Sequence, residues 1–260
     1  MTAVILCGGL GTRLREETEF KPKPMVEIGG RPILWHIMRG FRHHGIRRFV
    51  LCLGYRGDVI RDYFLNYARH HADIEVDLRS GGVATLSESG IEDWRVVLAE
   101  TGAETMTGAR IKRALRYVDG QQFLATYGDG VADVDLAAVL AHHRQQKRKA
   151  TVTAVHPSSR FGELALDGAI VRSFSEKPQV HEGWINGGFF VFERAVFDPV
   201  PSDDPGIVLE TGVLEGLARE GQLAVYRHGG FWQCMDTYRE MQLLNQMWAS
   251  GRAPWRTWQA

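Results

Sequence analysis

The chain is organised around a glycine-rich stretch, Leu6-Cys7-Gly8-Gly9-Leu10-Gly11-Thr12-Arg13-Leu14, and the segment Lys21-Pro22-Lys23-Pro24-Met25 that follows it. The apolar run at residues 3–6 predicts a buried strand, and the glycines predict a turn directly after it. Such a turn presents unhindered backbone N–H groups at the carboxyl end of a parallel sheet, where phosphates bind. Arg13 adds a planar fork of donors and Lys23 a compact charge. The stretch therefore predicts an α/β fold with a phosphate-binding loop.

The spacing of the glycines excludes the two common phosphate loops. Gly8-Gly9-Leu10-Gly11 lacks the G-x-G-x-x-G spacing, and the lysine comes too late for a P-loop. The order G-G-x-G-T-R-L followed by P-K-P is instead similar to the signature of the sugar-1-phosphate nucleotidyltransferases. A plain glycine-rich turn beside a solvated arginine is the alternative, and it is the weaker one because Arg13 and Lys23 are both in register with the glycines.

Composition limits the class of protein. The 260 residues hold one α/β domain or two small ones, and 31 basic residues balance 31 acidic ones. Without net charge, we expect neither a nucleic-acid partner nor a membrane partner. No apolar run approaches the ~18 residues that span a bilayer, and the start lacks the basic residues of a signal peptide. Cys7, Cys52 and Cys234 are widely spaced, which argues against disulfides and metal clusters. We expect a soluble, cytoplasmic protein.

Alternating strands and helices predict a Rossmann-like, doubly wound mixed sheet that is mostly parallel, with right-handed crossovers. The expected strands cover residues 3–6, 49–53, 95–99 and 123–127, and the expected helices cover 33–45, 59–67, 109–117 and 136–143. Residues 74–78 alternate like a half-buried edge strand, and 79–93 read as a polar loop or small excursion. A mobile lid and a hairpin that contacts a partner are the two alternatives for this segment. Short strands at 151–155, 162–166, 169–174 and 187–192 predict a β-rich extension packed on the core. A helix over 207–220, a strand at 223–226 and a final helix complete the chain.

Two aspartates are candidate metal ligands. Asp129 lies between two glycines at the end of an expected strand, where a carboxylate can reach a metal-bound triphosphate over the sheet edge. A plain turn aspartate fits the same glycines equally well. Asp236 directly precedes the final helix, so a helix N-cap is its simplest interpretation. Local sequence alone leaves both alternatives open.

The tail holds two tryptophans, Trp255 and Trp258, among polar residues. A monomer with an extended tail would expose them to water. We therefore expect them to pack either onto a neighbouring subunit or back onto this one, and a homo-oligomer is the favoured prediction.

From Ala3 to Trp258 the chain resembles the glucose-1-phosphate cytidylyltransferases. The stretches that carry the resemblance are Lys21–Gly30, Glu104–Gly108 with Arg110–Arg113, Gly128-Asp129-Gly130-Val131, Trp184–Phe190 and Ala253-Pro254-Trp255. The resemblance implies a Mg²⁺-dependent transfer of CMP from CTP to α-D-glucose 1-phosphate, by in-line attack on the α-phosphate. The products would be CDP-glucose, for deoxysugar and polysaccharide biosynthesis, and pyrophosphate.

The resemblance also implies a single domain over residues 1–260 and a role for each matching residue. Residues 1–135 would bind the nucleotide, 136–235 would form the β-rich sugar-phosphate part, and 236–260 would be a C-terminal helix and tail. The implied catalytic residues are Arg13, Lys23 and Lys177, and the implied magnesium ligands are Asp129 and Asp236. The implied nucleotide contacts are Leu6, Gly8, Gly9, Gly11, Thr12, Arg13, Lys23, Thr107, Gly108 and Arg110, and the implied sugar-phosphate contacts are Glu176, Lys177, Asn186 and Gly187.

These residue types suit the implied chemistry. Phosphate oxygens are nucleophiles without deprotonation, so the obstacles are charge repulsion and alignment, which cations and a metal overcome. Segment 207–213 departs most from the family pattern, and Cys7, Ala109 and Cys234 are smaller departures. The alternatives are therefore another sugar 1-phosphate or phosphorylated acceptor, dTTP or UTP in place of CTP, and a non-catalytic binder of sugar nucleotides. The last is disfavoured, since every charged position that the chemistry needs is present.

Overall fold

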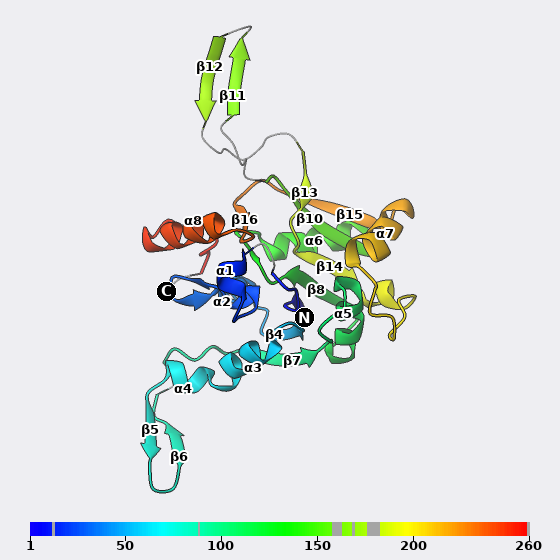
Figure 1. Cartoon of the computed structure of the whole chain (residues 1–260). Coiled ribbons are helices and arrows are strands. Elements are labelled where there is room, and N and C mark those ends of the chain that lie inside the picture. Colours follow the sequence, from blue (N-terminus) through cyan, green and yellow to red (C-terminus); the bar gives the residue numbers. More distant parts are fainter. Residues whose placement is uncertain (12–13, 88, 158–162, 168–169, 176–182, 259–260) are drawn as a thin grey trace.

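The computed structural model describes residues 1–11, 14–87, 89–157, 163–167, 170–175 and 183–258. Its body is one eight-stranded sheet (Figure 1). Its strands are β1 (Thr2–Leu6), β4 (Arg48–Leu53), β7 (Arg95–Glu100), β8 (Gln122–Tyr127), β10 (Ala150–Val155), β13 (Ile185–Asn186), β14 (Phe190–Glu193) and β15 (Leu223–His228). They follow the order β13-β10-β14-β8-β1-β4-β7, and β15 also pairs with β10. Strands β7, β4, β1 and β8 are parallel, whereas β14 is antiparallel to both neighbours. The predicted mixed, mostly parallel sheet is confirmed.

Strand β1 is buried on both faces, because the sheet is covered on both sides. Ala3 and Ile5 belong to one apolar cluster, and Val4 and Leu6 belong to the other. Since successive side chains of a strand point to opposite faces, a short apolar run is the pattern that such a strand requires. The doubly wound arrangement is therefore confirmed.

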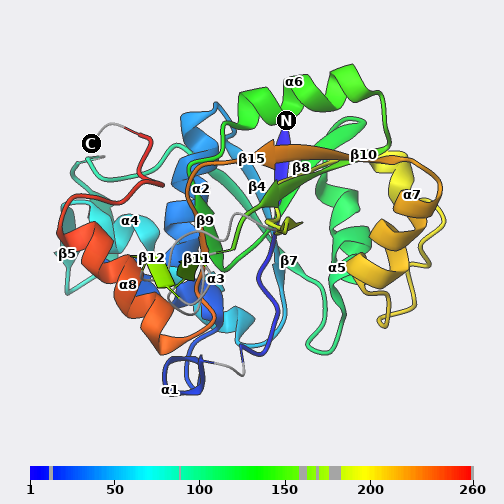
Figure 2. The ribbon, with the colours of Figure 1, turned by 90° about the horizontal axis from the view of Figure 1, so that it is seen from above.

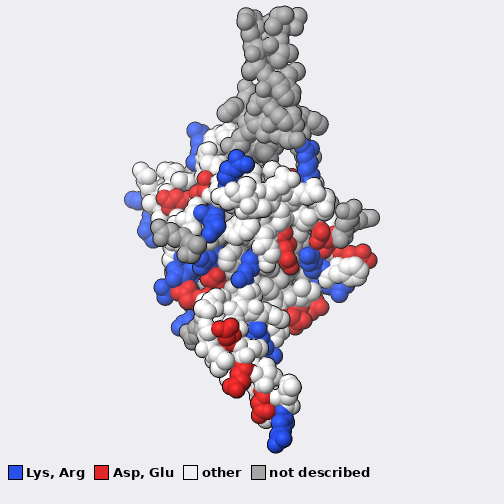
Figure 3. Space-filling view, turned by 90° about the vertical axis from the view of Figure 1, so that its left-hand side faces the viewer, with Lys and Arg blue, Asp and Glu red and all other residues white. Residues whose placement is uncertain are grey.

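The helices divide between these two faces (Figure 2). The first cluster packs with α2 (Ile33–His43), α3 (Gly57–Leu65), α4 (Tyr67–His71), α6 (Leu136–Gln146) and α8 (Tyr238–Ala249). The second cluster packs with α5 (Thr107–Ala114), η3 (Leu115–Tyr117), η4 (Arg194–Phe197) and α7 (Glu215–Arg219). Short elements after β1 are α1 (Arg15–Thr18), η2 (Lys23–Met25), β2 (Glu27–Ile28) and β3 (Arg31–Pro32). Among the described residues, no helix is both long and apolar enough to cross a membrane. On the face in Figure 3, basic and acidic side chains alternate without a patch of one sign.

Helix α2 illustrates how local sequence sets these elements. Pro32 precedes the helix in an extended conformation, as expected of a proline at a helix start. Apolar side chains at Ile33, Ile37 and Phe41 are buried on one stripe of the helix. The stripe ends at Gly45, which has a left-handed φ of +82° that favours glycine. The predicted helix is confirmed nearly residue for residue.

Residues 74–85 differ from the prediction. Strands β5 (Ile74–Asp77) and β6 (Gly82–Thr85) pair with each other and form a hairpin apart from the main sheet (Figure 1). The expected half-buried edge strand is thus largely exposed, and β6 lies within the expected loop. Asp77 stabilises the turn, because its carboxylate accepts hydrogen bonds from Arg79 N at 2.9 Å and Ser80 Oγ at 2.6 Å.

The predicted β-rich extension is divided in two. Strands β10 and β14 belong to the main sheet, whereas β11 (Glu163–Asp167) and β12 (Ile170–Ser175) pair with each other and with no strand of that sheet (Figure 1). The strand positions are confirmed within a few residues. The expected packing on the core is confirmed for β10 and β14.

The helix expected over 207–220 is present over residues 209–219, with one departure from regular α-helical geometry. A π-helical turn, η5 (Glu210–Leu214), precedes the short helix α7. Leu209 N donates to Thr107 Oγ1 at 2.8 Å, so α5 supplies a partner to the first turn, and Gly212 N donates to Val208 O at 2.8 Å. Ala109 N donates to Ile207 O at 3.0 Å, so residue 207 pairs with α5.

The two tail tryptophans pack back onto this chain, which was one of the two predicted outcomes. Trp255 is 1% exposed and stacks on Phe231 with ring centroids 5.6 Å apart. Trp258 is 8% exposed and meets Trp35 edge-on at 6.0 Å. The aromatic tail therefore does not require a neighbouring subunit.

Candidate active site

In the loop after β1, Gly8 is held by a hydrogen bond from Arg110, whereas Gly9 is exposed. Gly8 O accepts a hydrogen bond from Arg110 Nη2 at 3.0 Å, and a Cβ on Gly8 would lie 2.3 Å from the Arg110 Cζ. Gly9 is exposed, and a Cβ there would meet no atom within 4 Å. Gly11 adopts a left-handed φ of +62°, which favours glycine. The backbone at Gly9 is therefore accessible to a ligand, whereas Thr12 and Arg13 lie outside the described residues.

The buried side chain of Arg110 stabilises this loop. Arg110 is 4% exposed. Its guanidinium donates to five acceptors, of which four are backbone carbonyls and one is the Thr101 hydroxyl. Burial lowers the pKa of Arg110 from its ordinary value, but the guanidinium remains charged in this set of acceptors. The structure thus gives Arg110 a role in shaping the loop, and its contact with the base stays a prediction.

Asp129 projects from the turn between β8 and β9 (Gly130–Ala132). The preceding Gly128 donates its N–H to Leu6 O at 3.0 Å, so the turn lies against the end of β1. A Cβ on Gly128 would stand 2.7 Å from Leu6 O and 2.9 Å from Pro24 Cγ. Glycine is therefore required for this close approach, and it brings Asp129 beside the segment that carries Lys23.

Asp236 reaches the same place through a second pairing. Strand β16 (Trp232–Cys234) is antiparallel to β9 with Cys234 opposite Gly130, and Met235 N donates to Asp129 O at 2.8 Å. The N-cap of α8 is Thr237, whose hydroxyl accepts from Glu240 N at 3.3 Å in a capping box. The N-cap interpretation of Asp236 is therefore wrong, and its carboxylate is directed to Lys23.

Lys23 joins the two carboxylates. Its Nζ donates to Asp129 Oδ2 at 2.7 Å and also to Asp236 Oδ1, and its side chain is 12% exposed. Burial by itself would lower the pKa of Lys23, but the charge of Asp129 and the hydrogen bonds to both aspartates outweigh it and raise the pKa. Lys23 is therefore a charged ammonium held between two carboxylates.

This donor set fits a divalent metal. Carboxylate oxygens are the ligands that Mg²⁺ prefers, and both aspartates already converge on one cationic group. Within the described residues, no three His, Cys, Asp or Glu side chains gather into a metal site. The protein would therefore supply two carboxylates, and water and substrate phosphates would complete the coordination, as is usual for Mg²⁺.

Asn186 and Gly187 lie across the end of β8 from this group. Gly187 is buried, its O accepts from Trp232 Nε1 at 2.9 Å, and a Cβ on it would lie 2.5 Å from Val155 Cγ1. Asn186 is exposed and donates through Nδ2 to Tyr127 Oη at 3.0 Å. The other two predicted sugar-phosphate residues, Glu176 and Lys177, lie outside the described residues.

The structure adds two residues that sequence reasoning missed, Tyr127 and Glu210. The Tyr127 hydroxyl donates to Glu210 Oε1, and the Thr107 hydroxyl donates to Glu210 Oε2 at 3.1 Å. Gly108 allows α5 to lie close to residues 207–209, since a Cβ there would stand 3.0 Å from Ile207 O and 3.1 Å from Leu209 N. The available sequence signal was the place of Tyr127, the last residue of a strand before Gly128-Asp129.

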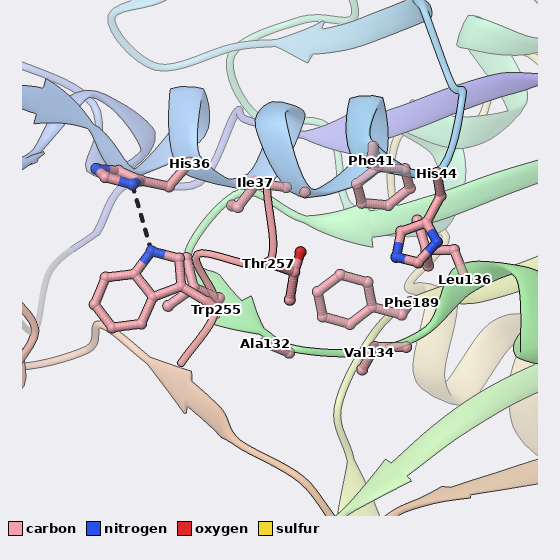
Figure 4. A pocket seen from close by; sticks show the side chains of 12 residues that line it. His36, Ile37, Phe41, His44, Ala132, Val134, Leu136, Phe189, Trp255 and Thr257 are labelled. Atoms are coloured by element: carbon pink, nitrogen blue, oxygen red, sulfur yellow. Dashed lines mark hydrogen bonds between the residues drawn. The ribbon is translucent and has the colours of Figure 1, made fainter. Parts of the chain in front are cut away.

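Two hollows elsewhere on the molecule contain none of the predicted site residues. One is a cavity of about 10 Å³ beside Trp255 and His36, joined by a hydrogen bond of 3.4 Å (Figure 4). It has room for at most about one water molecule. The other is an open, polar depression of about 410 Å³ that includes Arg39, Arg42 and Trp258. The candidate site described above lies instead at the carboxyl ends of β1 and β8.

Comparison with known proteins identifies relatives over nearly the whole chain. The family described as nucleotidyl transferase matches residues 2–233. A glucose-1-phosphate cytidylyltransferase of Salmonella typhi is 48% identical over 260 residues, which is 100% of each chain. A D-glycero-alpha-D-manno-heptose 1-phosphate guanylyltransferase of Aneurinibacillus thermoaerophilus is 31% identical over 76% of this chain and 77% of its own. The crystal structure of HddC from Yersinia pseudotuberculosis complexed with GMP-PN has a TM-score of 0.69 at 22% identity, over 95% of this chain and 99% of that one, and shows the fold alone.

Proposed function

Because this chain belongs to the nucleotidyl transferase family, we propose that it transfers CMP from CTP to α-D-glucose 1-phosphate, giving CDP-glucose and pyrophosphate. Similarity over the whole chain to a glucose-1-phosphate cytidylyltransferase supports the choice of base and sugar. The observation that carries the reaction type is the meeting of Lys23 with Asp129 and Asp236 beside an open glycine loop. This arrangement suits a metal-bound triphosphate that reacts with a second anion.

The bond changes need no proton transfer. A non-bridging oxygen of the sugar phosphate forms a bond to the α-phosphorus of CTP, while the bond from that phosphorus to the bridging oxygen of the β-phosphate breaks. Pyrophosphate leaves with the electron pair. The protein therefore has to hold two polyanions close together and in line.

The predicted catalytic residues, the predicted metal ligands and two loop glycines have places in this scheme. Asp129 and Asp236 would hold Mg²⁺, which supplies charge neutralisation to the triphosphate when bound. Lys23 then turns its ammonium from the carboxylates to an α-phosphate oxygen. The backbone at Gly9 and Gly11 would bind the β- and γ-phosphates, with Arg13 on the leaving pyrophosphate and Lys177 on the sugar phosphate.

The sugar is the part of the proposal with a specific rival. Glu210 lies in the divergent segment 207–213, and it is connected through Tyr127 to Asn186, a predicted sugar contact. A change in this segment can therefore alter which sugar fits. Another sugar 1-phosphate is the second candidate substrate.

Pyrophosphate release tests the proposal. The enzyme with Mg²⁺ is assayed against CTP, UTP, dTTP and GTP, each with a panel of sugar 1-phosphates. We expect the highest kcat/KM for CTP with glucose 1-phosphate. Release with UTP or dTTP alone contradicts the cytidyl assignment, and a preference for another sugar with CTP contradicts the glucose assignment. No release with any pair favours a non-catalytic binder.

We also propose that the chain forms a homo-oligomer. The β5–β6 hairpin exposes Val76, Leu78 and Val83, with Leu78 92% exposed. An isolated two-stranded hairpin is marginally stable in water, so packing against a second copy would stabilise it. Light scattering of the purified enzyme tests this: a mass above 29.2 kDa is expected, and a monomer contradicts it.

A cytoplasmic location is proposed on the state of the cysteines. Cys7 and Cys52 are buried free thiols, and Cys234 is free as well. Unpaired thiols are typical of a reducing compartment. Cell fractionation tests the location, and recovery outside the cytoplasmic fraction contradicts it.

A further inference from the structure

A chain of side-chain hydrogen bonds crosses the carboxyl end of β8 and connects α5 with β13. Thr107 Oγ1 donates to Glu210 Oε2 at 3.1 Å, and the Tyr127 hydroxyl donates to Glu210 Oε1. Asn186 Nδ2 donates in turn to the Tyr127 oxygen at 3.0 Å. Residues from four separate elements thus form one network between the predicted nucleotide side and the predicted sugar side.

Backbone N–H groups at both ends fix the direction of every bond in this network. Leu209 N donates to Thr107 Oγ1 at 2.8 Å, so the Thr107 hydroxyl proton is directed to Glu210. Gly188 N donates to Asn186 Oδ1 at 2.9 Å, so the Asn186 amide presents its NH₂ group to Tyr127. Position 210 therefore receives two protons, and an ionised carboxylate is the side chain that accepts both.

The network is well placed to be rigid. Tyr127 and Glu210 are half-buried, and each makes two hydrogen bonds within the network. Asn186 is exposed, and one of its two amide protons is used by Tyr127. Among the described residues the second amide proton makes no hydrogen bond, and the exposed side chain is accessible to a ligand.

We propose that Tyr127 and Glu210 are positioning residues that orient the Asn186 amide toward a hydroxyl of the sugar. The proposal rests on the proposed function, in which Asn186 contacts the sugar. A donor that is already oriented loses less freedom on binding, so the two residues act on sugar affinity through Asn186. They also give segment 207–213 a direct physical connection to the sugar.

Calorimetric titration with CDP-glucose and with CTP tests this inference. Tyr127→Phe removes the hydroxyl that accepts from Asn186 Nδ2. Glu210→Gln replaces one of the two accepting oxygens of the carboxylate with an NH₂ group, which then faces another donor. We expect each variant to bind CDP-glucose about tenfold more weakly, in the range of one lost hydrogen bond, and to bind CTP within about twofold of wild type. The double variant should be no weaker than Glu210→Gln alone, because both changes break the same network.

Matched controls are Tyr226→Phe, a half-buried tyrosine on β15, and Glu215→Gln, an exposed glutamate just after η5. Both should bind CDP-glucose as wild type does. Unchanged CDP-glucose affinity in Tyr127→Phe and Glu210→Gln overturns the inference. An equal loss for CTP and CDP-glucose, together with a lower melting temperature, indicates a merely structural role and also overturns it.

The failure of the proposed function has a different signature. In that case wild-type protein does not bind CDP-glucose but binds the nucleotide sugar that the preferred pair of the substrate panel would form. The same variants are then titrated with that nucleotide sugar and its nucleoside triphosphate, and the same selective loss is expected.

Discussion

Lys23 Nζ lies 2.7 Å from Asp129 Oδ2, although 106 positions separate the two residues in the chain. The ion pair exists because Gly128 allows the β8–β9 turn to contact Leu6 and Pro24. Asp236 joins the same ammonium from β16. Lys23 thereby holds two mutually repelling carboxylates together at the place where a metal-bound nucleotide would react.

Replacement of Lys23 should affect catalysis far more than folding. Lys23→Met removes the cation expected at the α-phosphate, and we expect kcat to fall by about 100-fold, as for loss of one preorganised charge. The control is Lys21→Met, since Lys21 is 31% exposed and pairs with Glu17 at 3.4 Å. Steady-state pyrophosphate release measures both variants, and a Lys23→Met rate within threefold of wild type would exclude Lys23 from the reaction.

The two aspartates should likewise be essential for turnover. Asp129→Asn and Asp236→Asn keep the size of the side chain but weaken metal binding, so we expect turnover to fall by at least about 100-fold. Asp119→Asn is the control, because Asp119 is 76% exposed and pairs with Arg48 at the surface. Circular dichroism should show an intact fold in all three. Near-normal rates in the Asp129 and Asp236 variants would remove these residues from the site.

Neighbouring glycines of the loop should respond in opposite ways to alanine. Gly8→Ala drives a methyl group into Arg110 and should destabilise the fold by about 1–3 kcal/mol. Gly9→Ala meets no protein atom and should leave the melting temperature unchanged, while the methyl group obstructs the phosphates and raises KM for CTP about tenfold. Thermal melts with CTP kinetics distinguish the two, and an unchanged KM in Gly9→Ala would place the triphosphate elsewhere.

His36 predicts a fall in stability at acidic pH. Burial lowers its pKa from 6.5 to about 4, and Trp255 Nε1 donates to its unprotonated Nδ1 at 3.4 Å. Between these values the unfolded chain binds the extra proton and the folded chain does not, so stability is complete above pH 6.5 and is lost as pH falls toward 4.

At pH 5 the loss attributable to His36 is about 2 kcal/mol. Urea unfolding at pH 7 and pH 5 measures it in wild type, in His36→Gln and in the exposed control His70→Gln. The pH dependence should shrink in His36→Gln alone. Equal slopes in all three proteins would show that His36 is not buried in its neutral form.

Local sequence predicts most of the sheet, because each strand and helix depends on its own pattern of burial. Strand β1 reads as an apolar run since both of its faces are covered, and α2 follows its stripe to Gly45. The β5–β6 hairpin was predicted only as one of two alternatives, because its strands pair with each other and neither has a buried face. Periodicity indicates a strand there, but not what it pairs with.

The site was less accessible to sequence reasoning. From local sequence, Asp236 fits both a helix N-cap and a metal ligand. Thr237 is the N-cap in the structure, and the pairing of β9 with β16 brings Asp236 to the site. Glu210 was missed because the backbone before it bonds to α5, a contact that no local pattern indicates. The resemblance to a family predicted that Lys23, Asp129 and Asp236 share one site, which no local sequence pattern indicates.

The magnesium requirement tests the central claim, that Asp129 and Asp236 share one metal-bound nucleotide with Lys23. The Mg²⁺ concentration for half-maximal pyrophosphate release is measured at saturating CTP and glucose 1-phosphate in wild type, Asp236→Asn and Asp119→Asn. We predict a rise of at least about tenfold for Asp236→Asn and no change for Asp119→Asn. An unchanged requirement in Asp236→Asn would contradict the account.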